Sequence, residues 1–226
     1  MSDFDWQWPF AWEVLPALLA AAVNTVIAAL LSFVLALVLG LGLALWRRYL
    51  PGAALIGFLA EFIRRTPPLV QIYFLYFVLP ETGLVLDALT TGVIALGLHF
   101  ATYIAEVYRA GIDNVPHGQF DAAAALGLGR WRIMWSVILP QALPPILPAL
   151  GNYLIIMFKE TPLLSAIAVV EMLDEAKIIG SHTFRYTEPI TIVGAVFLGL
   201  SLASAWAIRR FERRIGRGVA LDRAPF

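Results

Sequence analysis

The sequence predicts an all-α integral membrane protein, a single domain over residues 1–226 with about five transmembrane helices. Of the 226 residues, 60% are hydrophobic and only 14% are charged, whereas soluble domains are nearer half apolar. The mean hydropathy is +0.80. The apolar residues also come in long runs, and a helix needs roughly 20 of them to cross a bilayer. These three observations place the chain in the membrane class.

Charges beside the apolar runs predict how the spans are oriented. The first run covers residues 15–45, and Arg47 and Arg48 follow it at once. Because Lys and Arg concentrate on the cytoplasmic side of membrane spans, we expect the N-terminus outside. The other expected spans are 53–79, 91–107, 142–158 and 190–208. The last span is followed by a group of arginines that predicts a cytoplasmic C-terminus: Arg209, Arg210, Arg213, Arg214 and Arg217.

The second expected span contains an interruption rich in charge and proline. Glu61 and Arg65 are four residues apart, so they can pair on one helix face. Two prolines follow Thr66, and a residue before proline avoids the helical region, so we expect a break there. Charges within a span usually face protein or a water-filled cavity. In the alternative, the cluster only marks the cytoplasmic boundary, and residues 69–79 are then too short to cross alone.

Polar residues also follow a helical stripe in the third expected span. His99, Thr102, Tyr103 and Glu106 have the i, i+3, i+4, i+7 spacing that places side chains on one face. Such a stripe faces the bundle interior, where it either lines a solute path or forms a hydrogen-bond network between helices. Asn152, a lone amide in the fourth expected span, has the same two interpretations.

The fourth expected span has irregular ends. Three prolines near its start, Pro144, Pro145 and Pro148, predict an irregular entry. Residues 159–162 are expected to break the segment, and a helix is expected to resume over about 163–180. That second helix carries several carboxylates, so we expect it to lie at the outer face of the membrane or to enter the membrane only partly.

The segment between the third and fourth spans, about 113–140, predicts a short helix followed by a turn and re-entry into the bilayer. Ala122 to Ala125 favour helix, and Asp121 is expected near the positive end of that helix. Gly127 and Gly129 are expected to terminate it. Trp131, Arg132 and Trp135 then suit an interfacial segment, and Pro140 is expected to start the next helix.

The same segment resembles the cytoplasmic loop signature of permease subunits of ATP-binding cassette importers. That signature is Glu-Ala-Ala, three residues, Gly, nine residues, an aliphatic, one residue and Leu-Pro. This chain has Asp121-Ala122-Ala123, Gly127, Val137 and Leu139-Pro140 at that spacing, with Asp for Glu and Val for the usual Ile. The resemblance implies a coupling helix that docks on an ATPase subunit. The coupling residues it implies are Gly118, Gln119, Asp121, Ala122, Ala123, Gly127, Leu139 and Pro140.

Three further segments are similar to the polar amino-acid uptake permeases of this family. They are Glu61–Gln71, Tyr103–Ile112 and Lys159–Ser165. Arg65 stands where the family usually has Gly, Pro68 where Leu is usual, and His99 where Asn is frequent. These matches run in order across most of the chain.

The resemblance implies an importer of the bacterial cytoplasmic (inner) membrane, with this chain as a multi-pass subunit in membrane lipid. Its implied partners are ATPase subunits, a second permease that is identical or paralogous, and an extracytoplasmic solute-binding protein. The implied solute is a polar amino acid, or alternatively an opine or a compatible solute such as ectoine. The expected solute path contains Glu61, Arg64, Thr66, His99, Tyr103, Glu106 and Asn152. The expected outer gate contains Lys159, Glu160 and Thr161.

The sequence motifs do not support ATP binding, a metal site or enzymatic catalysis in this chain. The chain has no Gly-x-x-x-x-Gly-Lys-Ser/Thr loop, so we expect ATP and Mg to bind the partner, and no cofactor in this chain. The three histidines show no metal spacing, and no nucleophile turn is present, so we expect neither a metal site nor an enzyme. The basic C-terminal tail suits lipid headgroups better than nucleic acid. A carrier or channel that needs no ATPase, and a membrane enzyme or scaffold, stay as more remote alternatives.

Overall fold

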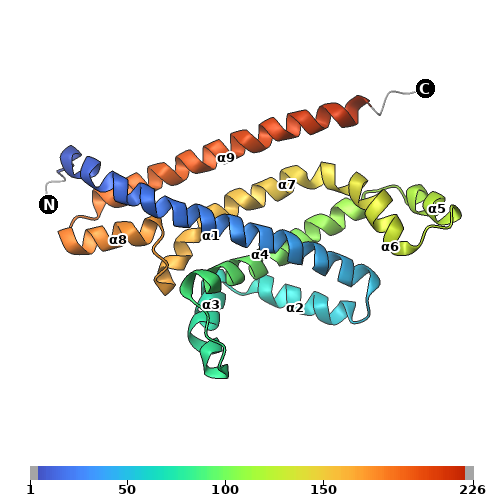
Figure 1. Cartoon of the computed structure of the whole chain (residues 1–226), viewed down its shortest axis with the longest axis horizontal. Coiled ribbons are helices and arrows are strands. Elements are labelled where there is room, and N and C mark those ends of the chain that lie inside the picture. The colour runs from blue at the N-terminus through green and yellow to red at the C-terminus, as the bar shows by residue number, and fades with distance from the viewer. Residues whose placement is uncertain (1–4, 222–226) are drawn as a thin grey trace.

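The structure is a computed structural model that describes residues 5–221, with side-chain surroundings given through residue 210. Within the described residues every regular element is a helix, which confirms the all-α prediction. Four of these helical segments are long and apolar enough to cross a membrane: Trp8–Tyr49, Ala88–Asp113, Arg130–Ile167 and Thr187–Arg210. Figure 1 shows them running roughly along one direction.

The centre of the fold is the pair α1 (Trp8–Tyr49) and α4 (Ala88–Asp113). Small residues let the two backbones approach closely. A Cβ built on Gly40 of α1 would lie 2.7 Å from Ile104 of α4, and one on Gly97 of α4 would lie 2.6 Å from Leu35 of α1. The N-terminus of α4 is capped by Asp87, whose carboxylate accepts a hydrogen bond from the Thr90 amide at 2.9 Å. Both helices are longer than the predicted spans.

The second predicted span is divided into two parts. Helix α2 (Ala53–Arg65) ends at Thr66, which is extended with φ −96° and ψ 135°, so the predicted break near Thr66 is confirmed. Helix α3 (Pro68–Tyr73) continues as a π-helical turn, Phe74–Val78, and a 3₁₀ turn, Leu79–Thr82. Four continuous helices of the described residues are long and apolar enough to cross a membrane, and the second predicted span, being broken, is not among them.

The Gln71 side chain bridges the α2–α3 break. The Gln71 amide donates to the carbonyl oxygens of Ile63 at 2.7 Å and Thr66 at 3.0 Å. The Ile63 carbonyl also accepts from the Thr66 amide at 3.2 Å, so the Gln71 side chain adds to the hydrogen bonds of the carbonyls at the end of α2. In Figure 1, α2 runs back beside α1, whereas α3 projects sideways from the bundle.

The fourth span was predicted to begin irregularly at its three prolines, and that position is wrong. Helix α6 (Arg130–Ile133) leads through a π-helical turn, Met134–Ile138, into α7 (Leu139–Glu160), which contains Pro144, Pro145 and Pro148 without a break. The irregularity lies instead in the π-helical turn directly before Leu139. Pro140 stands at the start of α7 but does not begin a separate span, because the helical path from α6 is continuous.

The predicted outer helix over 163–180 is also wrong in its bounds. Residues Thr161–Ile167 form a 3₁₀ helix, and Ala168 adopts a left-handed conformation with φ 58° that ends it. Helix α8 (Met172–Thr183) starts only after Glu171, whose side chain caps it by accepting from the Asp174 amide at 2.8 Å. The sequence alone did not indicate that Glu171 acts as a cap.

Helix α9 (Thr187–Leu221) lies along the edge of the bundle, against α7 and α8. It is the least buried of the four long segments, and Leu198, Leu202 and Trp206 are about 60% exposed. In Figure 1, α8 lies near the N-terminus, and the short helices α5 (His117–Ala125) and α6 lie at the opposite end. The two ends of the bundle therefore expose different helices to other molecules, α8 at one end and α5 and α6 at the other (Figure 1).

Candidate functional site

Helix α5 ends in a tight hydrogen-bonded turn. The Gly127 amide donates to the Ala124 carbonyl at 2.9 Å, and the Leu128 amide donates to the Ala123 carbonyl at 3.2 Å. This is the Schellman arrangement, which needs a left-handed residue after the helix, and Gly127 supplies it with φ 77°. The prediction that Gly127 terminates the helix is confirmed.

Two other details of the α5 prediction are wrong. Gly129 does not terminate α5; it is extended, with φ −67° and ψ 152°, and stands at the N-cap of α6. Helix α5 starts at His117, so Asp121 lies in its second turn and no acidic residue lies in its first. The dipole argument for Asp121 therefore fails, because that effect is confined to the first turn.

The expected coupling residues fall into an exposed group and a buried group. Gly118, Gln119, Asp121 and Ala122 are exposed, as are Gly127 and Pro140. Ala123 and Leu139 are only 4% and 3% exposed, and both belong to an apolar cluster with Ile112, Val115, Ile133, Met134 and Ile138. The cluster fixes α5 to the ends of α4 and α7, so small and polar groups remain on the outside.

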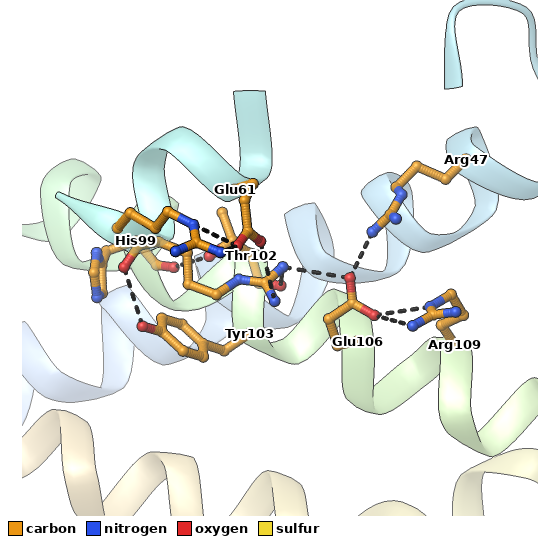
Figure 2. A network of polar contacts seen from close by, with 9 residues as sticks. Arg47, Glu61, His99, Thr102, Tyr103, Glu106 and Arg109 are labelled. Atoms are coloured by element: carbon orange, nitrogen blue, oxygen red, sulfur yellow. Dashed lines mark hydrogen bonds and ion pairs between the residues drawn. The ribbon is translucent and has the colours of Figure 1, made fainter. Parts of the chain in front are cut away.

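A polar cluster centred on Glu106 joins three helices (Figure 2). One oxygen of Glu106 lies 2.5 Å from Arg47 Nη1 of α1 and 3.3 Å from Arg64 Nη2 of α2. The other lies 2.6 Å from Arg109 Nη2 of α4. Glu61 is similarly occupied, with Arg65 at 2.7 Å and Arg64 at 3.8 Å. Both carboxylates of the expected solute path are thus already paired with guanidinium groups.

Aromatic rings lie beside this cluster. The Arg64 guanidinium carbon is 5.4 Å from the centre of the Tyr103 ring, within cation–π distance. The Tyr103 ring centre lies 5.4 Å from that of His99 and 6.1 Å from that of Tyr153. His99 is 5% exposed, and within the described part of the chain its Nδ1 has no hydrogen-bond partner. The Nε of Arg64 is likewise buried without a described partner.

The structure brings some of the remaining expected residues near this cluster and not others. The Thr66 hydroxyl donates to the Phe62 carbonyl at 2.8 Å, so it serves the α2–α3 break. Asn152 is exposed on α7 in the isolated chain, although it lies in a membrane span. At the expected outer gate, Thr161 is buried and donates to the Phe158 carbonyl, whereas Lys159 is exposed.

Sequence reasoning missed four residues of the site. Arg47 was considered only as a marker of membrane orientation, and Arg109 only as part of the family-like segment Tyr103–Ile112. Phe100 and Tyr153 complete the aromatic group, with ring centres 6.2 Å apart. The i, i+3 spacing of Glu106 and Arg109 was the available signal for one of these contacts.

The structure combines long apolar helices, a partly buried polar cluster and an exposed small-residue helix at one end, as expected for the membrane component of a transport complex. The family of binding-protein-dependent transport system inner membrane components matches residues 47–217, and the chain belongs to that family. It is therefore a membrane permease subunit, a class that works with an ATPase and a binding protein. This agrees with the resemblance seen in the loop of residues 118–140.

The relatives cover nearly the whole chain. The chain is 46% identical over 219 residues to a probable amino-acid ABC transporter permease of Sinorhizobium fredii, covering 94% of this chain and 93% of the relative. It is 36% identical to the glutamine transport system permease GlnP of Escherichia coli, covering 94% of this chain and 98% of the relative. A solved amino-acid ABC transporter in complex with histidines superposes with a TM-score of 0.84 at 34% identity, covering 93% of this chain and 100% of that one.

Proposed function

We propose that this chain carries a polar amino acid across the bacterial inner membrane as the permease subunit of an ATP-driven importer. The observation that carries the solute class is the half-buried guanidinium of Arg64, whose side chain is 23% exposed, over the ring of Tyr103. This pairing offers a donor for a carboxylate beside π faces for an ammonium. The names of the similar permeases, which concern amino acids and glutamine, support the same class.

The charge arrangement suggests how a zwitterion is held. Glu61 and Glu106 each have an arginine within 2.7 Å, so neither is available for a solute ammonium without losing an ion pair. Arg64 shares Glu106 with Arg47 and Arg109, and its Nε has no described partner. The solute carboxylate therefore binds Arg64, and the ammonium lies against aromatic rings such as Tyr103 and Tyr153.

The other expected path residues receive supporting roles in this proposal. Glu106 and Glu61 orient Arg64, and Thr66 maintains the break that places Arg64 beside α4. His99 borders the aromatic group with an unpaired ring nitrogen that suits a polar solute. Asn152 faces the second permease, because an exposed amide within a span requires a protein or water-filled neighbour. Lys159, Glu160 and Thr161 shape the outer gate.

The energy for the cycle comes from partner subunits. We place α5 in the cytoplasm, where its exposed face docks on an ATPase that binds ATP and Mg, and this chain itself catalyses no reaction. A binding protein delivers the solute at the opposite end, near α8 and the N-terminus. The two permeases, identical or paralogous, then alternate between outward and inward openings.

The test is solute uptake by proteoliposomes that contain the complete importer and its binding protein. Replacing Arg64 by Lys keeps the charge but removes the planar fork, so we expect uptake to fall at least tenfold. The matched control is Arg132→Lys on exposed α6. Equal uptake by the two variants would remove Arg64 from the solute path.

An opine is the second candidate solute. The chain is 34% identical to the octopine transport permease OccM of Rhizobium radiobacter, covering 87% of this chain and 84% of the relative. An opine of the octopine kind carries two carboxylates, and a cluster with more guanidinium groups than carboxylates offers a partner to each of them. Competition of unlabelled octopine against glutamine uptake distinguishes the two solutes.

A further inference from the structure

A polar cavity lies between the ends of α1 and α4, on the side of the molecule that carries α5 (Figure 1). Its volume is 290 Å³, near the lower end of the range for small-molecule pockets, roughly 300–1,000 Å³. Its walls come from both helices: Ala44, Arg47, Arg48, Arg109, Ile112 and Asp113. None of the aromatic residues of the proposed solute path lines it.

The cavity has more cationic than anionic groups. Three of its lining residues are arginines, and the two carboxylates that they contact are Asp113 and Glu106, which leaves 3 − 2 = 1 positive charge. Arg64 also contacts Glu106, so the charge of that carboxylate is divided among three arginines. The cavity is therefore suited to an anion.

The arginines also retain hydrogen-bond donors. Arg48 uses Nη1 on Asp113 at 2.6 Å, and Arg47 uses Nη1 on Glu106 at 2.5 Å. Arg109 uses Nε and Nη2 on Glu106. Since each guanidinium has five N–H donors, all three keep groups for a further acceptor. Their side chains are 30%, 28% and 55% exposed, so a ligand can reach them.

The surroundings of the cavity favour a phosphate among possible anions. Guanidinium groups bind phosphate oxygens through paired, charge-assisted hydrogen bonds. Basic pockets between membrane helices, on the cytoplasmic side, are sites for anionic lipid headgroups. Trp46 at the same end of α1 is 44% exposed, as expected for a ring at the membrane interface.

We propose that the cavity between Arg47, Arg48 and Arg109 binds a phosphate group, either the phosphodiester of an anionic phospholipid headgroup or a free phosphate. The site is placed to affect α5. The Arg48 guanidinium carbon lies 5.3 Å from the centre of the Phe120 ring of α5. A phosphate that holds Arg48 therefore also steadies the base of α5.

The experiment compares Arg48→Gln with Arg132→Gln in the purified importer complex. Arg48→Gln removes one phosphate donor but leaves all contacts of Glu106 intact, whereas Arg132 is exposed at the same end and does not line the cavity. In the first arm, delipidated complex receives phosphatidylglycerol or zwitterionic phosphatidylcholine, and native mass spectrometry measures retained lipid. In the second arm, inorganic phosphate is compared with chloride at equal ionic strength for its effect on thermal stability.

A lipid site predicts that phosphatidylglycerol retention falls about tenfold in Arg48→Gln, with Arg132→Gln unchanged and phosphatidylcholine unaffected. A free-phosphate site predicts that inorganic phosphate stabilises the original protein and the Arg132→Gln variant but not Arg48→Gln. If Arg48→Gln does not assemble, Arg48→Lys takes its place in both arms, because lysine keeps the charge but lacks the planar guanidinium. The proposal is overturned if neither ligand distinguishes the Arg48 variants from Arg132→Gln. Uptake is not the readout, so this result is independent of the proposed solute.

Discussion

The Glu106 cluster and helix α5 are built in opposite ways. In the cluster, one half-buried carboxylate contacts guanidinium groups from α1, α2 and α4, and each side chain depends on its charged neighbours. In α5, the outward residues are small or uncharged apart from Asp121, and the shape depends on a left-handed Gly127 and on buried Ala123. The first region is thus sensitive to charge and the second to backbone conformation and side-chain size.

The largest effect is expected from Glu106→Gln. The substitution keeps the shape but removes the negative charge, so three arginines repel one another without a counterion, and breaking such partly buried pairs is strongly destabilising. We expect uptake in proteoliposomes to fall to background. Glu175→Gln, a half-buried carboxylate of α8, is the control. Normal uptake by Glu106→Gln would contradict the view that this carboxylate holds the arginines of α1, α2 and α4 together.

The next effect concerns the turn after α5. Gly127 has φ 77°, and a β-branched residue there costs roughly 1–2 kcal/mol. A Cβ at Gly127 meets nothing within 4 Å, so Gly127→Val acts on the backbone rather than by collision. We expect the complex to assemble but ATP hydrolysis to lose its stimulation by the loaded binding protein. Gly129→Val, which is equally open but lies outside α5 at φ −67°, is the control. Stimulation that survives Gly127→Val would mean that the shape of this turn is not required.

A smaller effect, on stability alone, is expected where α1 meets α4. A Cβ on Gly40 would lie 2.7 Å from Ile104 and 3.1 Å from the Ala101 carbonyl, whereas one on Gly42 meets nothing within 4 Å. We therefore expect Gly40→Ala to cost about 1–3 kcal/mol, and Gly42→Ala to cost nothing measurable. Thermal denaturation of the two variants in detergent provides the comparison. Equal midpoints would contradict the close packing of these helices.

The smallest expected effect is a change in how thermal stability depends on pH when Glu171 is replaced. Burial raises the pKa of this carboxyl, against the lowering effects of the Leu173 and Asp174 amides and of Lys177, and with a further increase from the Asp174 carboxylate. Because the folded state holds this proton more tightly than the unfolded chain, Glu171 lowers stability as the pH rises above its unfolded pKa, about 4.3. We expect the melting temperature of Glu171→Gln to fall less between pH 4 and 7 than that of the original protein. Identical slopes would contradict the buried setting of Glu171.

The sequence predicts the parts of this fold that depend on local pattern. The break at Thr66, the stripe that leads from His99 to Glu106 and the stop at Gly127 all follow from spacing and from single-residue preferences. The sequence does not predict which elements pack against one another. Nothing in the local pattern around Arg47 indicated its contact with Glu106, 59 positions away. The left-handed Ala168 and the cap by Glu171 depend on packing against α1, where the Met172 amide donates to Thr25.

The central claim is that the exposed face of α5 is held by the ATPase subunit in the cytoplasm. The chain contains no cysteine, so single-cysteine variants need no prior replacements. The measurement is cross-linking of Ala122→Cys to cysteines in the ATPase of the assembled importer, with Trp135→Cys, exposed outside α5, as the comparison. We predict a cross-linked product for Ala122→Cys and none for Trp135→Cys. Labelling of Ala122→Cys by an impermeant maleimide added only to the outside of cells, with no cross-link, would contradict the account.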